Sequence, residues 1–466
     1  MSNMQKFPHG LLDLSFGSLR SEAKDTKSAA AFLEAQGIRF LLAQFTDVHG
    51  SLKSKSVPVR CLENLVTEGA GFAGAAVAGF DMTVFDPEYM MVGDLETLAL
   101  LPWAPGYARI LGTGTVAGTA FALDPRNALK AQCARLAAHG WIANTGLEPE
   151  FYLLRRDESG ALLPFDPADT LAKPAYDYRS LANVRPFVEQ IVGSLQALGI
   201  GVYQIDHEDA NGQYEVNFKY ADAVTSADNI QLFKMAASEI AHSLGGICSF
   251  MPKLSATTTG NGMHVHLSIA DAGGDDLFRD DTDPKGMGLS PLAYKFMAGV
   301  LKHAKALTAL LAPSVNSYKR LVVGTPDSPY WAPVYIAYGN NNRSAMVRIP
   351  YGRIEIRTGD GGMNVYLALA AIIAAGLDGI ENDLDPGEPH NVNFFTMPPA
   401  DVAALGVETL PQNLDQAINC LEADTVLASA LGERLVNAFI KVKRQEWRDY
   451  HLTVSQWELN RYLTFF

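Results

Sequence analysis

The sequence has little cysteine and lacks the common nucleotide-binding and nucleophile motifs. Its 466 residues include four cysteines, and none of them stands in a CxxC pair. Neither a disulfide scaffold nor a thiolate zinc site is therefore indicated. No GxxxxGK[ST] phosphate loop and no GxSxG nucleophile elbow occurs. If the chain binds a nucleotide, metal ions and arginines must hold the phosphates.

Positive charge is also in short supply. The chain has 37 basic and 51 acidic side chains, which gives a formal net charge of −14. Phosphate backbones select basic surfaces, so we expect no nucleic-acid partner. An anionic substrate must then be bound by local arginines or metal ions against an unfavourable overall field.

Long hydrophobic runs are absent. The longest, from Tyr366 to Leu377, is too short to cross a bilayer and predicts a buried helix. Residues 1–27 mix charges with short apolar pieces and lack the apolar core of a signal peptide. We therefore expect a cytoplasmic protein without a membrane partner. Hydrophobic residues make up 48% of the chain, which is enough for a sizeable core.

The length suits two domains, and turn signals suggest where they divide. Residues 1–27 are interpreted as an extension. A helix at 28–37 and a hairpin at 38–45 and 51–59 open a small α+β domain that runs to residue 122. Asp124-Pro125 then begins a helix, with aspartate at the N-cap and proline at N1.

In the remainder, 123–466, strands alternate with long helices. One helix is expected at 226–244, and another begins at Ser290-Pro291 and ends before Pro313. The stretch 425–463 is helical by pattern.

Several predicted strands carry charged side chains at alternate positions, and such positions share one face of a strand. A Gly-containing turn near residue 212 brings two more carboxylates. These side chains are Glu148 and Glu150, His264, His266 and Ser268, Arg353, Glu355 and Arg357, and Glu208 and Glu215. Taken singly, each strand could simply turn its polar face to water. Together they favour a site, because close carboxylates repel one another unless a cation or proton lies between them.

The chemistry of this set indicates both its metal and its substrate. Five glutamates and a histidine form a mainly oxygen-ligand set, which suits Mg²⁺ or Mn²⁺ rather than zinc. Interspersed arginines indicate an anionic substrate such as a carboxylate or a phosphate.

In their order along the chain, these segments resemble the glutamine synthetase family from about Ile38 to Phe466. The matching segments are 147–151, 206–215, 262–268, 316–321, 342–350 and 353–357. The resemblance implies an α+β fold with an N-terminal β-grasp domain at 28–122. A large catalytic domain with an antiparallel active-site sheet would follow at 123–466. It also implies a homo-oligomer of two stacked hexameric rings, a dodecamer, with each active site between neighbouring subunits.

The same resemblance implies roles for individual residues. One metal site would use Glu150, Glu208 and Glu215, and the other Glu148, His264 and Glu355. Glutamate would be bound by Arg320 and Arg357, with Gly260 nearby and Glu150 in the same subsite. Arg343 and Arg348 would act on the phosphoryl group. ATP would be contacted by Tyr220, His266, Ser268 and Arg353.

Four positions depart from the family pattern. Two acidic positions that would hold and deprotonate ammonium align with Ala73 and Trp331. Thr259 stands where an asparagine near glutamate is usual. Phe395 aligns with a tyrosine that is adenylylated in some family members, so we expect no control of that kind.

All six expected metal ligands are kept while both ammonium-binding acids are lost, which favours a changed amine over a dead enzyme. The pattern is similar to the branch of the family that joins methylamine to glutamate, with Trp331 facing the amine. The expected activity is thus ATP-dependent ligation of L-glutamate and a small alkylamine through a γ-glutamyl phosphate. Asp209 and Asp327 are both candidates to accept the amine's proton.

Other interpretations stay open at this point. The chain could use ammonia, a longer amine or a polyamine. It could be a phosphotransferase of the wider fold group, such as a guanidino kinase. A non-catalytic homologue is a further alternative, but it would not need to keep buried like charges.

Overall fold

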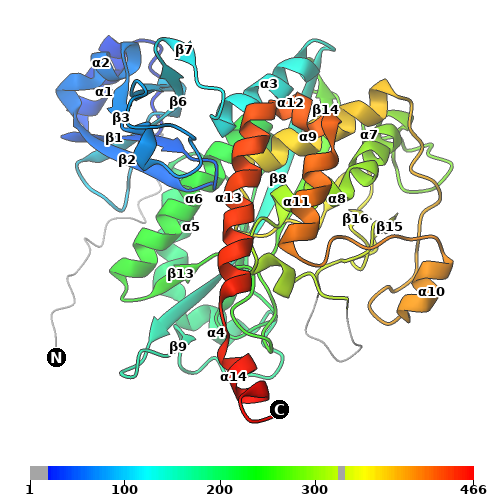
Figure 1. Ribbon diagram of the computed structural model, residues 1–466. Coiled ribbons are helices and arrows are strands. Elements are labelled where there is room, and N and C mark those ends of the chain that lie inside the picture. The colour runs from blue at the N-terminus through cyan, green and yellow to red at the C-terminus, as the bar shows by residue number, and fades with distance from the viewer. Residues whose placement is uncertain (1–18, 324–330) are drawn as a thin grey trace.

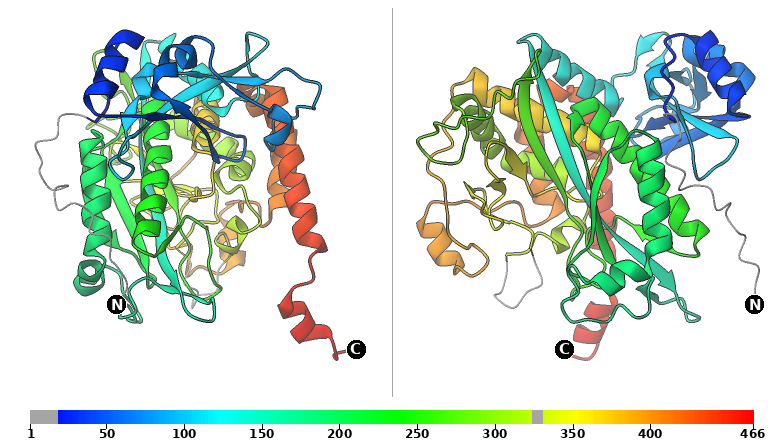
Figure 2. Two further views of the ribbon diagram at one scale, coloured as in Figure 1. Left: turned by 90° about the vertical axis from the view of Figure 1, so that its left-hand side faces the viewer. Right: turned by 180° about the vertical axis from the view of Figure 1, so that it is seen from behind.

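The computed structural model describes residues 19–323 and 331–466. Most of the expected extension at 1–27, as well as Asp327, therefore lies outside the described residues. Figures 1 and 2 show a small N-terminal unit beside a larger body.

The N-terminal unit is built on a mixed sheet. Helix α1 (Thr26–Ala35) precedes it, and β1 and β2 form the expected hairpin. β1 also pairs with β6 in parallel, although some sixty residues separate them. The strands follow the spatial order β2 (Leu52–Pro58), β1 (Phe40–Thr46), β6 (Tyr107–Val116), β4 (Tyr89–Gly93) and β3 (Ala70–Phe72).

The larger body contains a second sheet, whose main path is antiparallel except at one edge, where β15 and β16 run parallel. Helices α3 (Pro125–Ala137) and α6 (Ala223–Ser243) pack against β8, its long central strand. The strand order is β10 (Val202–His207), β11 (Gln213–Phe218), β8 (Trp141–Arg156), β14 (Met263–Asp271), β17 (Ile354–Ile356), β16 (Val347–Ile349) and β15 (Tyr338–Asn340).

The alternation predicted from the sequence determines which face of this sheet is apolar. Val265 and Leu267 of β14 and Ile354 and Ile356 of β17 are almost fully buried in the hydrophobic core. Their neighbours along each strand must then point to the opposite face. The polar residues singled out in the sequence therefore lie together on that face.

Helix starts follow capping chemistry. Asp124 caps α3 as expected, with its carboxylate accepting hydrogen bonds from the backbone N–H groups of Arg126 and Asn127. Helix α6 begins at Ala223, three residues before the expected start, because Asp222 caps it. The apolar run near residue 370 forms the buried helix α9 (Val365–Glu381). No helix among residues 19–323 and 331–466 is both long and apolar enough to cross a bilayer.

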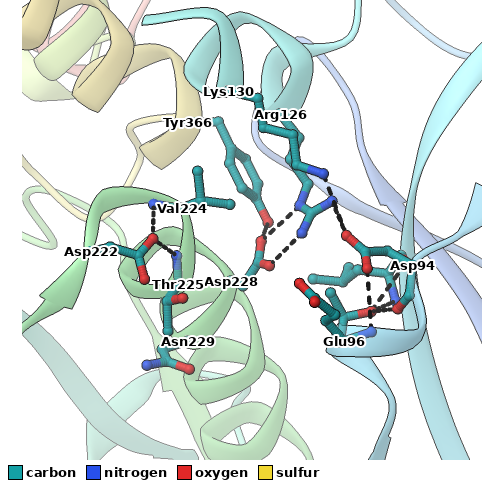
Figure 3. Close-up of polar contacts among 12 residues, drawn as sticks. Asp94, Glu96, Arg126, Lys130, Asp222, Val224, Thr225, Asp228, Asn229 and Tyr366 are labelled. Atoms are coloured by element: carbon teal, nitrogen blue, oxygen red, sulfur yellow. Dashed lines mark hydrogen bonds and ion pairs between the residues drawn. The ribbon is translucent and has the colours of Figure 1, made fainter. Parts of the chain in front are cut away.

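A buried polar cluster joins the two units (Figure 3). Arg126 of α3 donates to Asp228 of α6 at 2.8 Å and to Asp94, next to β4, at 3.1 Å. The hydroxyl of Tyr366 on α9 donates to Asp228 at 2.7 Å. Removing one partner of such a buried ion pair strongly destabilises the fold, because the other charge then stays buried without a partner. The cluster therefore fixes the N-terminal unit against helices α3, α6 and α9 of the larger body.

One long helix expected from the sequence is broken, and the stretch expected to be helical near the C-terminus is divided. The expected helix starting at Ser290 is two helices, α7 (Pro291–Lys302) and α8 (Ala304–Leu311), which meet at His303. The expected stretch 425–463 is three helices, α12 (Thr425–Leu431), α13 (Glu433–Leu452) and α14 (Gln456–Tyr462). Gly432 has a φ of +95° between the first two, a conformation that glycine readily adopts.

At the junction of α7 and α8, the buried His303 contacts two carboxylates. Its side chain is 4% exposed, its Nδ1 lies 2.5 Å from Asp424 and its Nε2 lies 3.0 Å from Asp378. Lys302 also pairs with Asp378 at 2.7 Å. Burial tends to lower the pKa of His303, but the hydrogen bonds to Asp424 and Asp378 outweigh it and raise that pKa above its usual 6.5. The imidazolium form is thus the one that the fold stabilises.

We expect this histidine to make stability pH-dependent. A folded-state pKa above the unfolded value contributes stability that is fully present below about pH 6.5 and is lost as pH rises through the folded value. The melting temperature of the parent should therefore fall more steeply between about pH 6 and 9 than that of a His303→Gln variant. Thermal unfolding at several pH values measures this slope. The exposed His242, changed to Gln, is the control, and equal slopes in parent and His303→Gln would contradict the assignment.

Candidate active site

Strand register brings the charged side chains of four strands into one place. Glu150 of β8 lies opposite Glu215 of β11, and Glu148 lies opposite His264 of β14. His266 of β14 lies opposite Glu355 of β17. Side chains directly opposite on adjacent strands are nearest neighbours, so pairing alone assembles most of the site.

The first ligand group consists of Glu150, Glu208 and Glu215. One carboxylate oxygen from each lies within 4.8 Å of the others. Burial raises the pKa of Glu208 to about 8, and the charges of Glu150 and Asp206 add to the effect. Burial and neighbouring glutamates likewise raise the pKa of Glu215 well above its usual value. Three crowded carboxylates with few compensating donors are a fit for a divalent cation with oxygen ligands.

The second group lies beside the first and differs in its electrostatics. Atoms of Glu148, His266 and Glu355 lie within 4.8 Å of one another. The expected ligand His264 is also close, with Nδ1 3.5 Å from Glu148 and 3.7 Å from Glu355. Both histidines therefore face Glu148. His266, expected at the nucleotide, lies 2.9 Å from Glu148 through its Nε2.

The negative charges of the second group are offset by neighbouring histidines and arginines, and those of the first group are not. Burial tends to raise the pKa values of Glu148 and Glu355, but neighbouring cations and donors lower both. For Glu148 these are His264 and His266, whose ring nitrogens lie 3.5 Å and 2.9 Å from its carboxylate. For Glu355 the charges of His264 and Arg357 lead. A cation bound here would compete with these partners, and the histidine nitrogens would become its ligands.

Both groups open into one cavity of about 480 Å³. Seven carboxylates and four arginines are among its described lining residues, so it holds three more negative than positive charges when all are ionised. A bound anion, such as a carboxylate or a phosphate, would add to this excess of negative charge. The cavity can therefore take an anionic substrate together with divalent cations.

The two arginines expected to bind glutamate lie in this cavity. Arg320 is buried and donates to the backbone oxygens of Thr358 at 2.9 Å and of Arg357 at 3.2 Å. Arg357 pairs with Glu355 at 2.6 Å through Nη1. Within the described part of the chain, its buried Nε has no hydrogen-bond partner. A side chain on Gly260 would crowd Arg320, so its missing Cβ keeps this part of the cavity open.

The two arginines expected to contact the phosphoryl group differ in their freedom. Arg348 donates to Glu355 at 2.7 Å and to Asn341 at 2.8 Å. Arg343 is exposed and lines the cavity. One is thus held in place, and the other reaches in from the rim.

A second cavity, of about 380 Å³, adjoins the first, with which it shares Glu148 and Tyr203. It brings together all four residues expected to contact the nucleotide, namely Tyr220, His266, Ser268 and Arg353. Arg353 donates to Nδ1 of His266 at 3.1 Å, which turns the opposite ring nitrogen toward Glu148. This cavity therefore meets the first one at a carboxylate of the second ligand group.

A buried ion pair supports the turn that carries Glu208 and was not anticipated. Nε2 of His207 lies 2.7 Å from Asp169, and its Nδ1 lies 2.7 Å from the backbone oxygen of Glu208. Asp169 also accepts the backbone N–H of Gly212 at 2.6 Å. The sequence indicated only the turn. Asp169, the partner of His207, comes from about forty residues earlier in the chain and follows no local pattern.

Trp331 forms part of the cavity wall. Its indole Nε1 donates to Oδ2 of Asp209 at 2.8 Å, and Thr259 donates to the same oxygen at 3.1 Å. Phe395 meets the indole edge to face, with ring centroids 6.0 Å apart. Ala73, by contrast, is exposed on the N-terminal unit and is not among the residues that line this cavity.

Some lining residues were missed in the sequence. Asn217 is two positions beyond Glu215 on the same strand face and donates to it at 2.6 Å, so the alternation rule could have found it. Tyr351 has a φ of +66°, which its preceding sequence does not reveal. Among the missed residues are Asp206, Tyr176, Tyr203 and Asn217 in the first cavity, and Lys219, Arg279 and Tyr351 in the second.

Comparison with known proteins agrees with this geometry. Residues 122–462 match the family model for the catalytic domain of glutamine synthetase. A glutamate–methylamine ligase from Methyloversatilis universalis is 53% identical over 94% of this chain and 99% of its own. A glutamine synthetase from Halobacterium salinarum is 41% identical over 92% of this chain and 95% of its own.

Solved structures give the same result at the level of the fold. A structure described as a GmaS/ADP complex superposes with a TM-score of 0.87 at 43% identity, covering 93% of this chain and 99% of that one. The α+β glutamine synthetase-like fold expected from the motifs is thereby confirmed. By its sequence and its structure, the chain belongs to the glutamine synthetase family.

Proposed function

We propose that this protein joins methylamine to the γ-carboxylate of L-glutamate, with cleavage of ATP to ADP and phosphate. The product would be γ-glutamylmethylamide. The observation that carries the choice of amine is Trp331 in the wall of the carboxylate cavity, where the family pattern has an acid. The 53% identical relative named glutamate–methylamine ligase supports the same choice.

The first task of the site is to hold glutamate. The α-carboxylate would lie on Arg320 and Arg357, since arginine forks match a carboxylate and the buried Nε of Arg357 is available for one. Gly260 leaves the space for it. The γ-carboxylate would then point toward the two ligand groups.

Two Mg²⁺ or Mn²⁺ ions fit those groups. Glu150, Glu208 and Glu215 would hold one, and Glu148, His264 and Glu355 the other, with His266 adjacent. Bound there, such ions neutralise phosphate charge and polarise phosphoryl oxygens. They would also relieve the repulsion that raises the pKa of Glu208.

The chain's own residues would perform the activation. A carboxylate is a poor electrophile, so the γ-carboxylate oxygen attacks the terminal phosphorus of ATP and forms an acyl phosphate, with ADP as the leaving group. This transfer needs positioning and charge stabilisation more than covalent chemistry. Tyr220, His266, Ser268 and Arg353 would place ATP in the second cavity. Arg343 and Arg348 would then stabilise the transferred group and the departing phosphate.

The amine would attack the carbonyl carbon of the acyl phosphate beside Trp331. An alkylammonium has a pKa near that of lysine, about 10.4, so it must lose a proton before it attacks. The indole face attracts the cation by roughly 0.5–2 kcal/mol and can pack on the methyl group. Without acids at positions 73 and 331, ammonium would be held poorly.

The assembly would be the dodecamer of the family, with residues 28–122 as the β-grasp domain and 123–466 as the catalytic domain. Ala73 lies outside the cavity of its own chain, so it would face the site of a neighbouring subunit. Helix α14 stands away from the body (Figures 1 and 2). It exposes Trp457, and the residues that follow it expose Leu463 and Phe465, which supports a subunit contact there.

A change at Glu355 tests the ligand groups. Glu355→Gln keeps the shape and removes the charge that faces Arg348, Arg357 and the histidines. We expect phosphate release with ATP, glutamate and methylamine to fall by about a thousandfold. The folded state is checked by sedimentation and thermal unfolding. The exposed Glu388, changed to Gln, is the control, and near-parent activity of Glu355→Gln would remove the metal assignment.

A change at Arg357 tests the glutamate clamp. Arg357→Lys keeps the charge but loses the planar fork and the buried Nε. We expect the KM for glutamate to rise by about tenfold or more, since a buried carboxylate would lose a charge-assisted hydrogen bond. The KM for ATP should stay within about twofold of the parent. An unchanged KM for glutamate would place the clamp elsewhere.

A double change tests the choice of amine. Ala73→Asp combined with Trp331→Glu restores the acids of the ammonia-using pattern. We expect the ratio of kcat/KM for ammonium to that for methylamine to rise by about tenfold or more, because the cation regains carboxylate partners. Assays with both amines, and with each single variant, measure it. A folded double variant that keeps the parent ratio would show that these positions do not set the amine.

A further inference from the structure

We propose that Asp209 is a positioning residue, which fixes the Trp331 indole in the cavity wall and so sets the preference for an alkylated amine. The inference rests on the proposed function. It adds to it the residue that makes an otherwise exposed tryptophan selective.

Asp209 is built into the site through three hydrogen bonds. Its Oδ2 accepts the indole N–H of Trp331 at 2.8 Å and the hydroxyl of Thr259 at 3.1 Å. Its backbone N–H donates to the carboxylate of Glu208 at 3.1 Å. The group that holds the indole is therefore fixed to a residue of the first ligand group. Any shift of Asp209 moves Trp331 relative to the reacting atoms.

Trp331 needs such an anchor. It is 54% exposed, and it lies between the main cavity and an outer hollow of about 320 Å³ that Phe395 and four asparagines help to line. An exposed side chain with space on both sides keeps several rotamers, and ordering it costs entropy. Asp209 binds the polar edge of the indole, and the ring of Phe395 lies at 87° to it. Together they hold the ring in one orientation.

The choice of aspartate has a chemical consequence. A hydrogen bond from the indole to a carboxylate is stronger than one to a neutral acceptor, and because the N–H lies in the ring plane this bond covers neither ring face. A free face can attract a small ammonium ion and can contact its methyl group, which ammonium itself lacks. The carboxylate and the indole thus act as a unit. Asp209 aims the ring, and the ring contacts the amine.

A double-mutant cycle tests the coupling. The variants are Asp209→Ala, Trp331→Phe, which keeps a ring but loses the N–H donor, and the two combined. We expect each single change to raise the KM for methylamine by about tenfold. The double variant should be no worse than either single one, because both remove the same hydrogen bond. The KM values for glutamate and ATP should stay within about twofold.

Two further variants sharpen the cycle. Asp209→Asn keeps an acceptor oxygen, so its KM for methylamine should stay within about threefold of the parent. Asp401→Asn removes an equally negative, exposed side chain on α10 (Pro399–Ala404) and should change nothing. If Asp209→Ala does not assemble, Trp331→Phe and Asp209→Asn carry the test. The proposal then fails if Trp331→Phe leaves the KM for methylamine unchanged.

The outcomes separate this proposal from the proposed function. Additive effects in the double variant, or a change in the KM for glutamate as large as that for the amine, would overturn the role of Asp209. A parent enzyme that does not prefer methylamine to ammonium would overturn the proposed function instead. In that case the double-mutant cycle is measured with the amine that the parent enzyme uses, through the KM for that amine.

Discussion

Electrostatic repulsion among buried carboxylates is the constraint on which the rest of this structure depends. Glu148, Glu150, Glu208, Glu215 and Glu355 line one cavity, and burial tends to raise the pKa values of Glu148, Glu208, Glu215 and Glu355. Histidines and arginines offset the charges of Glu148 and Glu355. The repulsion among Glu150, Glu208 and Glu215 is not offset in this way. That remaining charge distinguishes the cavity from an ordinary polar cleft and fits a bound cation.

Such a site survives only on a rigid frame, and the frame is built from the same kind of interaction. Arg126 of α3 joins Asp94 of the N-terminal unit to Asp228 of α6, and His303 contacts two carboxylates at a helix junction. His207 and Asp169 hold the turn that bears Glu208. In each case a buried charge has its partner, so removing either member costs more than the pair contributes. In the cavity, burial and neighbouring carboxylates instead raise the pKa values of Glu208 and Glu215, and a bound cation would offset that repulsion.

The sequence predicted what local patterns encode. The period of two along β8, β14 and β17 showed which side chains share a face, and capping residues gave the starts of α3 and α7. It failed where the decisive partner is remote. At the helix junction His303 contacts Asp378 and Asp424, and the support of the turn near Gly212 comes from Asp169. The register between strands also depends on residues far apart in the chain. For that reason the sequence did not predict that His266, expected at the nucleotide, lies beside Glu148. A helical pattern in one segment cannot reveal a carboxylate supplied by another.

The size of the available interactions also decides how an enzyme of this kind could distinguish two similar cations. One buried methyl group contributes about 1 kcal/mol, and an indole face adds roughly 0.5–2 kcal/mol for either amine. Positive selection through the methyl group therefore gives little more than tenfold. A carboxylate that contacts ammonium directly contributes more than either. Discrimination must then come mainly from withholding carboxylates, and this is consistent with Trp331 occupying the one oxygen of Asp209 to which it donates. The tryptophan weakens the binding of ammonium in two ways, because it replaces the acid and because it occupies an oxygen of a neighbouring carboxylate. It still leaves a surface that the methyl group can contact.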